Sequence, residues 1–269
     1  MRMNGYPQWE LEQGAVYRWT LGTLSIWISR EAREWLYAWS HVQTVEPVSE
    51  LTFESDVSKP EDLSWTRVIA PDATRTVSFA PRLADRGVVV KSDESVTVLP
   101  HSNAELYVPL PVWLTVSAGV NEPRLLFEAP TRELHRRWFG SSMQGSLCYS
   151  VFARLASDRS EVRLLPVSAI CPIRIRNQSH EQFRSDSVFV QANQCKLYRL
   201  GEQHAHPFTN LQSSTVVVSV AGVDELSFSV ASERARTGGD LQQVADWRRR
   251  PDDSWWKRGY MLFQRISNY

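Results

Sequence analysis

Period-two alternation of apolar and polar residues dominates the first 230 residues of this 269-residue chain, and helical periodicity is scarce there. In the segment 24–29, every second residue from the first is a leucine or an isoleucine, as on one face of an extended strand. A polar turn follows, and the return segment places three aromatic rings on one face: Trp35, Tyr37 and Trp39. The alternation therefore predicts an all-β fold with an aromatic-rich hairpin near its start.

Segments of the same character recur along the chain, and Pro, Gly, Asp or Asn residues separate them. Further strands are expected over 75–79, 87–91, 95–99, 104–116, 145–155, 161–166, 171–176, 187–190, 196–200, 214–221 and 225–230. Strands at this spacing are typical of β-sandwiches, and the chain is long enough for two of them. We expect two packed β-sandwich-like lobes, residues 1–130 and 131–232.

Two segments depart from the strand pattern. Residues 45–64 carry six carboxylates among Pro47 and Pro60, which predicts an acidic surface excursion rather than a folded element. In the tail, residues 233–269, Asp240 is a candidate N-cap for a short helix that ends by residue 249, and a second helical pattern follows. The expected fold therefore ends in a short helical C-terminal tail.

Charge and cysteine content narrow the possible partners and the compartment. Thirty basic and thirty acidic residues give a formal net charge of zero, which disfavours nucleic acid as a partner. The three cysteines, Cys148, Cys171 and Cys195, are odd in number and contain no CxxC, as expected for reduced thiols in a cytoplasmic protein. The longest apolar run, within 215–223, is too short to cross a bilayer, so membrane insertion is not expected.

The glycine- and serine-rich segment 140–145 raises the question of a nucleophilic serine. The G-x-S-x-G elbow requires a spacing that this segment misses by one residue, and the residues that follow alternate as a strand does. Cys148 is a weak candidate nucleophile if His135 or His180 approaches it in space. A buried structural cysteine inside a strand is the favoured interpretation.

Metal and cofactor chemistry has little support in the sequence. His204 and His206 would lie on one face of a strand and are weak candidate metal ligands, but the residues after them supply no third ligand. Neither a P-loop nor a GxGxxG motif after a strand occurs. We therefore expect no metal and no cofactor.

Aromatic residues suggest two kinds of ligand. Trp35, Tyr37 and Trp39 could stack on a sugar or another small molecule, although residues at this spacing more often form the core of a sandwich. Basic residues lie beside tryptophans over 135–140 and 247–258, a mixture that single-strand nucleic-acid binders use. Two aspartates interrupt the second stretch, so surface arginines that cover tryptophans are the favoured interpretation.

Three stretches carry a resemblance to a known family. They are WFGSSMQGSLCYSVFARL at 138–155, ELYVPLPVWLTV at 105–116 and CPIRIRNQSHEQF at 171–183. Together they resemble a bacterial and archaeal domain-of-unknown-function family, DUF 432, over most of the chain. The resemblance implies a β-rich architecture and no particular activity.

The absence of each familiar catalytic pattern favours binding over catalysis. We expect a non-enzymatic binding or assembly module of the bacterial cytoplasm, with a protein partner or self-association. The alternative is a β-sandwich that binds a small molecule or carbohydrate through Trp35, Tyr37 and Trp39. A third possibility is an enzyme that depends on Cys148.

Overall fold

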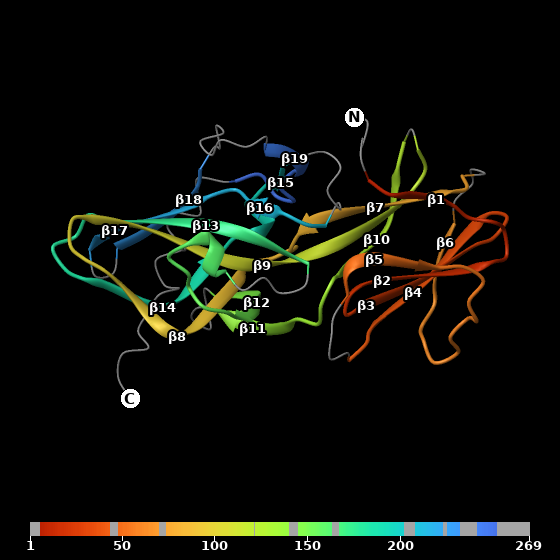
Figure 1. The fold of residues 1–269 in the computed structure, drawn as a ribbon, viewed down its shortest axis with the longest axis horizontal. Helices are drawn as coiled ribbons and strands as arrows, with labels where there is room; N and C mark the ends of the chain where they lie inside the picture. Colours follow the sequence, from red (N-terminus) through yellow and green to blue (C-terminus); the bar gives the residue numbers. More distant parts are fainter. Residues whose placement is uncertain are drawn as a thin grey trace. The chain divides into compact units, whose positions relative to one another are not determined.

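A computed structural model describes the chain over 6–43, 48–69, 74–120, 122–139, 145–162, 167–201, 208–222, 225–231 and 241–251. In these ranges the regular elements are strands β1 to β19 and two three-residue 3-10 helices, η1 (Arg159–Glu161) and η2 (Ala192–Gln194) (Figure 1). The prediction of an all-β fold is confirmed. No helix in the same ranges has the length and apolar character needed to cross a bilayer.

The chain divides into two compact units that interleave along the sequence. The first unit comprises Met1–Arg82, Pro111–Glu133 and Glu202–Thr209, and the second comprises Leu83–Leu110, Leu134–Gly201 and Asn210–Tyr269. The long strand β9 (Ser102–Ala118) contributes residues to both. The expected lobes 1–130 and 131–232 stay a prediction, because compact units are not by themselves independently folding domains.

The first unit contains a five-stranded antiparallel sheet and a second group of strands. The sheet has the order β5 (Val48–Glu54), β2 (Val16–Gly22), β3 (Leu24–Arg30), β4 (Glu34–His41) and β6 (Thr66–Ile69). The second group has β7 (Thr76–Leu83) between β1 (Gln8–Glu10) and the C-terminal part of β9, on which β10 (Arg124–Pro130) pairs.

Aromatic rings from both groups form the core of the first unit. Trp19 on β2 is fully buried, and its ring centroid lies 5.0 Å from that of Phe79 on β7. The ring of Trp9 on β1 is steeply inclined to both of these rings. Its centroid lies 5.8 Å from that of Trp19 and 5.0 Å from that of Phe79. Because large aromatic rings remove much apolar area from water, this cluster is a principal attachment between the two groups of strands.

The second unit contains two further groups of strands. In the first, the order is β9, β13 (Ser168–Asn177), β16 (Leu211–Ser213), β15 (Leu197–Leu200) and β19 (Leu241–Ala245), with β17 (Val216–Gly222) on β13 and β18 (Glu225–Val230) on β17. The second is a four-stranded sheet in the order β11 (His135–Phe139), β12 (Ser146–Phe152), β8 (Val88–Val98) and β14 (Phe183–Val190).

The strand expected over 145–155 is present as β12, although it ends at Phe152 rather than at residue 155. Strand β12 runs parallel to β8, and Tyr149 and Val151 are buried on one face. Leu147, on the same face, is 39% exposed, so the row is only partly covered. Cys148 on the opposite face is fully buried as well, which shows that both faces of this strand are packed.

The prediction that residues 45–64 form an acidic surface excursion without a folded element is wrong for residues 48–54, which form β5. Strand β5 pairs antiparallel with β2, and Phe53 stacks on Tyr17 with ring centroids 5.9 Å apart. Glu54 lies opposite Arg18, and their charged groups are 3.7 Å apart. Phe53 lies between the two positions Thr52 and Glu54 and contacts the aromatic cluster through Tyr17, Trp9 and Trp19, so a strand is present despite the acidic composition.

The prediction of a helix between Asp240 and residue 249 is also wrong. Residues Leu241–Ala245 form β19, which pairs antiparallel with β15 and lies at the edge of its sheet. The guanidinium of Arg199 on β15 donates a hydrogen bond to Gln242 Oε1 at 2.7 Å. A partner strand some forty residues earlier in the chain therefore overrides the local capping signal. The second expected helix lies outside the described residues.

Two glycines of the first unit have positive φ angles, but only one of them also lacks space for a Cβ atom. Gly22 and Gly14 have φ angles of 66° and 84°, which disfavour any residue with a Cβ atom. A Cβ at Gly22 would collide with the backbone carbonyl oxygen of the buried Thr131, whereas a Cβ at Gly14 would meet nothing within 4 Å.

We predict that Gly22→Ala lowers the free energy of unfolding more than Gly14→Ala. The strain at either position costs about 1 kcal/mol, and the collision at Gly22 adds about 1–3 kcal/mol. Urea unfolding monitored by tryptophan fluorescence measures both changes. Equal losses in the two variants would contradict the close approach of Gly22 to Thr131.

Candidate functional site

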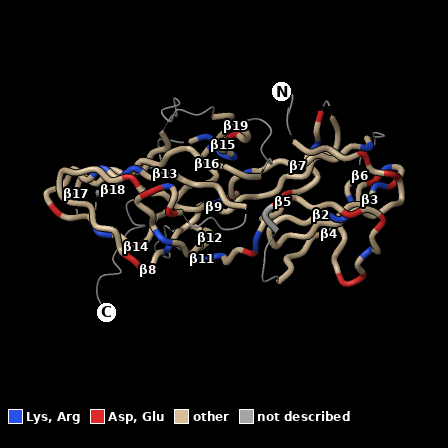
Figure 2. Tube along the Cα trace, viewed as in Figure 1, with Lys and Arg blue, Asp and Glu red and all other residues tan. Residues whose placement is uncertain are grey.

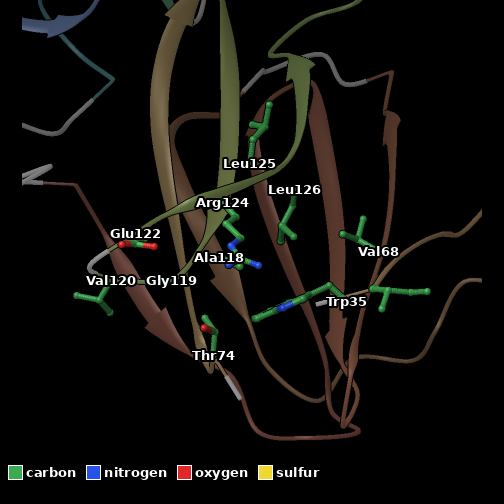
Figure 3. Close-up of a pocket in the computed structure, with 11 residues that line it drawn as sticks. Trp35, Val68, Thr74, Ala118, Gly119, Val120, Glu122, Arg124, Leu125 and Leu126 are labelled. Atoms are coloured by element: carbon green, nitrogen blue, oxygen red, sulfur yellow. The ribbon is translucent and has the colours of Figure 1, made fainter. Parts of the chain in front are cut away.

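A cavity of about 470 Å³ lies in the first unit (Figure 3). Its walls come from β4, β6, β10 and the end of β9, together with the turn that joins β9 to β10. The lining residues are Trp35, Val68, Ile69, Thr74, Ala118, Gly119, Val120, Glu122, Arg124, Leu125 and Leu126. Most of these side chains are apolar, and the exceptions include one guanidinium and one carboxylate.

A β-bulge in β10 shapes one wall of the cavity. The pairing of β10 with β9 shifts register between Leu125 and Phe127, so Leu126 has no partner residue on β9. Leu126 is nearly buried, while Leu125 beside it is 54% exposed. At a bulge, neighbouring side chains no longer alternate strictly between the two faces of the sheet. As a result, two consecutive leucines both line the cavity.

The opposite wall is formed by β4 and its neighbour β6. Trp35 pairs with Val68 across the two strands, and Trp35 is 1% exposed. The guanidinium of Arg67 holds β6 against β4 through two hydrogen bonds to the Glu34 carboxylate, 2.6 and 2.8 Å long. The Arg67 hydrogen bond lowers the pKa of the Glu34 carboxyl below its usual value. This exposed ion pair therefore keeps its charge at neutral pH.

The turn between β9 and β10 brings the charged side chains to the mouth of the cavity. Gly119 has a φ of 104° and its N–H donates to the Thr76 carbonyl at 2.9 Å, which fixes the start of the turn. Glu122 and Arg124 follow, and both are exposed. In the view of Figure 3, Arg124 lies on the side of the hairpin toward Trp35, and Glu122 lies toward the turn.

The rim of the cavity exposes an unusual amount of apolar surface. Ile69 is 78% exposed, Val120 is 58% exposed and Leu125 is 54% exposed. All three residues line the same cavity. Clustered exposed apolar side chains next to a concave site are a common mark of ligand-binding surfaces.

The three aromatic residues expected to bind a ligand lie in different environments. Trp35 lines the cavity, whereas Tyr37 stacks on Phe127 with ring centroids 4.1 Å apart. Trp39 is 40% exposed and lies edge-on to His41. The three rings therefore do not form one open stacking surface. A ligand role for them stays a prediction, and the cavity connects only Trp35 to a concave site.

The environment of Cys148 does not activate its thiol. Cys148 packs against Val89 and Phe189, and its Sγ donates to the carbonyl of Arg137 at 3.3 Å. Burial raises the pKa of the thiol to about 11, although the Arg137 guanidinium lowers it in part. His135 is exposed on β11 opposite Ser150. Among the described residues, the hydrogen bonds of Cys148 include none to an imidazole.

The structure describes only some of the remaining candidate metal ligands and thiols. His204 and His206 lie outside the described residues. Across the ranges that the structure describes, no three His, Cys, Asp or Glu side chains gather as a metal would require. Cys171 and Cys195 are buried and form no disulfide.

The two basic and aromatic stretches differ in structure. Residues 135–138 of β11 are exposed, with Trp138 at 51%. In the second stretch, the described part ends at residue 251, and the ring of Trp247 lies under the Lys196 ammonium at 4.4 Å. Figure 2 shows basic and acidic residues interspersed along the strands.

Sequence reasoning missed most residues of the cavity. Ile69 lies on the four-residue strand β6, which pairs with β4 about thirty residues earlier, whereas Leu125 and Arg124 lie on β10, which forms a hairpin with β9. The available signal was the Gly119 to Pro123 segment, which marks a turn between two apolar strands. That signal locates a hairpin but does not show that a cavity opens beside it.

Comparison with known proteins gives one family. The model of the family described as Protein of unknown function (DUF432) matches residues 5–260 of the chain. No curated protein and no solved structure gives a significant match.

We predict that Cys148 reacts slowly with iodoacetamide in the folded protein near neutral pH. A thiol pKa of about 11 leaves far less thiolate than an ordinary cysteine has, so labelling should be about 100-fold slower. Mass spectrometry of peptides after timed labelling measures the rate, and the same chain unfolded in urea is the control. Rapid labelling of folded Cys148 would show that its environment activates the thiol.

Proposed function

The chain belongs to the DUF432 family, and we propose that it is a non-enzymatic binding protein whose first unit takes a small amphipathic molecule with an acidic group. The observation that carries this proposal is the cavity beside Trp35, with apolar walls and Arg124 at its mouth. A preformed apolar site with few polar groups is the common form of a small-molecule site.

The size and lining of the cavity define the class of ligand. Its volume of about 470 Å³ falls in the range of roughly 300–1,000 Å³ that ligand sites occupy. Val68, Ile69 and Leu125 offer an apolar surface to the body of a ligand, whereas Trp35 and Leu126 are almost fully covered. The Arg124 guanidinium suits a carboxylate or a similar anion, because charge-assisted hydrogen bonds are strong and directional.

Catalysis has weaker support than binding. The charged side chains at the cavity, Arg124 and Glu122, are both exposed, and neither has the buried environment that prepares a catalytic acid or base. Cys148 lies in the second unit and has a raised pKa. We therefore propose a role in binding, without a resident metal or cofactor.

The proposed compartment is the bacterial cytoplasm. All three cysteines are buried, with no disulfide among them. Unpaired thiols in a chain of this size fit a reducing environment better than an oxidising one.

We predict that decanoate quenches tryptophan fluorescence of the protein in a saturable way. The Trp35→Phe variant should lose most of the change, and Trp138→Phe, which alters an exposed ring of the second unit, should keep it. Arg124→Ala should weaken decanoate binding about tenfold or more, because a hydrogen bond to a charged group is removed. Isothermal titration calorimetry gives the affinities.

Decanol is the matched control, since it has the same chain without the carboxylate. Its affinity should be nearly the same in the wild-type protein and in Arg124→Ala. If decanoate fails to bind the wild-type protein, if Trp35→Phe keeps the full fluorescence change, or if Arg124→Ala binds decanoate as tightly as the wild-type protein does, the cavity is not the site we propose.

The edge strand β11 favours a second candidate function, the docking of a protein partner. Strand β11 is the first in its sheet, and among the described residues no strand pairs with its outer edge. Arg136, Arg137 and Trp138 are exposed along it, and Trp138 lies opposite the part-exposed Leu147. Such an edge is a template for an added strand, and its charge suits an acidic one.

We predict that a synthetic peptide of alternating glutamate and valine binds this edge, whereas the matched lysine and valine peptide does not. Arg136→Glu combined with Arg137→Glu should abolish the binding, because it reverses the charge of the edge. Fluorescence anisotropy of labelled peptides measures the affinity, and light scattering of the chain alone tests self-association. Equal binding of both peptides would exclude this mode of docking.

A further inference from the structure

Two turns of the second unit place a pair of histidines side by side. His101 lies in the turn between β8 and β9, and His180 lies in the turn between β13 and β14. Nε2 of His101 is 3.0 Å from Nδ1 of His180, and the ring centroids are 4.7 Å apart at an interplanar angle of 79°. Both residues are exposed, so this imidazole pair is open to ions in solution.

The buried side chain of Asn177 holds both turns in place. Its Nδ2 donates to the carbonyl oxygens of Val98 and Leu99, at 3.1 and 3.0 Å, just before the first turn. It also donates to the carbonyl of Glu181 at 2.8 Å in the second turn. Its Oδ1 accepts from the N–H and hydroxyl of Ser179, at 3.1 and 2.7 Å.

These hydrogen bonds hold the two histidine-bearing turns together before any ion binds, so the imidazole pair is preorganised. Asn177 is 1% exposed, and its amide connects residues that are nearly 80 positions apart in the chain. Sites whose supporting groups are already bonded lose little entropy when a ligand binds.

The backbone of His101 is strained, which is a second and independent feature of the site. His101 has a φ of 52°, a left-handed conformation that is costly for a residue with a Cβ atom. The hydroxyl of Ser102 donates to the Leu99 carbonyl at 2.6 Å and helps to hold this turn. Strain of this kind persists only where the surroundings impose it, and it often accompanies function.

From this arrangement we propose that His101 and His180 form a binding site for a late first-row divalent metal ion, such as Zn²⁺ or Cu²⁺. Two imidazole nitrogens bound to one tetrahedral ion at about 2.0–2.1 Å lie about 3.3 Å apart. The observed 3.0 Å separation is a few tenths of an ångström shorter. Both rings are exposed, so they have room to turn until their nitrogen lone pairs converge on one ion.

The proton balance of the binding step is simple. In the free pair, one imidazole donates its N–H to the other. When the ion binds, the donating ring releases this proton to water and takes up one proton from water at its second nitrogen, so that both facing lone pairs bind the metal. Each ring remains neutral with one N–H, as a metal-bound imidazole must be.

In this proposal, the two imidazole rings are the only protein ligands of the metal ion. Within the described ranges, no group of three or more His, Cys, Asp or Glu residues could complete a larger set, so water fills the remaining positions. Imidazole favours copper, nickel and zinc, whereas Mg²⁺ and Ca²⁺ prefer oxygen ligands. A bound ion would join the two turns and stabilise the folded chain by mass action.

The test uses the full-length chain without an affinity tag, in the presence of a phosphine reductant. Zn²⁺ is titrated calorimetrically into the wild-type protein, His101→Asn and His180→Gln. Asparagine tolerates the left-handed backbone at position 101, so that variant isolates the loss of the imidazole. We expect the affinity for one zinc ion to fall about tenfold or more in each variant, and Mg²⁺ not to bind.

Two control variants identify the site. His135→Ala removes an exposed imidazole of β11, and a double variant, His204→Ala with His206→Ala, removes two that lie outside the described residues. Both should bind Zn²⁺ as the wild-type protein does. After the phosphine reductant is removed, because it would reduce Cu²⁺ to EPR-silent Cu⁺, electron paramagnetic resonance with Cu²⁺ should show two coordinated nitrogens in the wild-type protein and one in His180→Gln.

Three results would overturn the proposal. They are the absence of Zn²⁺ binding by the wild-type protein, an affinity that His101→Asn and His180→Gln leave unchanged, and a loss of binding in the control variants equal to that in these two.

Discussion

The aromatic cluster of Trp9, Trp19 and Phe79 is the contact on which the first unit depends. Burial of a ring the size of Trp19 contributes about 4–6 kcal/mol. Its indole Nε1 is buried without a hydrogen-bond partner among the described residues, at a cost of about 1–3 kcal/mol. The gain exceeds the cost, so packing and not polar bonding decides this core. The five-stranded sheet and the strands opposite it meet around these rings.

The candidate cavity is a consequence of how those strands meet. Tyr37 stacks on Phe127, which joins β4 to β10 next to the bulge at Leu126. The bulge and the turn at Gly119 prevent side chains from filling the space beside Trp35. The same local irregularities that interrupt the strand pattern therefore create the concave surface. In the second unit, an amide network around Asn177 has a comparable effect, because it holds two turns and their histidines together.

Alternation in the sequence was enough to predict the hairpin of β3 and β4 and the strand that contains Cys148. It failed for β5, where carboxylates occupy the outward positions of a genuine strand. It failed again for β19, where a capping residue suggested a helix and the partner strand β15 lies far away in the chain. In both cases a non-local pairing outweighed the local signal. The cavity was missed for the same reason, since Ile69 and Leu125 are distant in sequence and become neighbours only in the folded unit.

The sequence by itself determined the class of fold, the buried character of Cys148 and the neutral charge, because side-chain periodicity and composition are local properties. The tertiary structure alone decided which strands pair, where a cavity opens beside Trp35, and that His101 and His180 lie 3.0 Å apart. These features arise from contacts between residues far apart in the chain. Such contacts depend on strand order and register, which alternation along one strand does not encode.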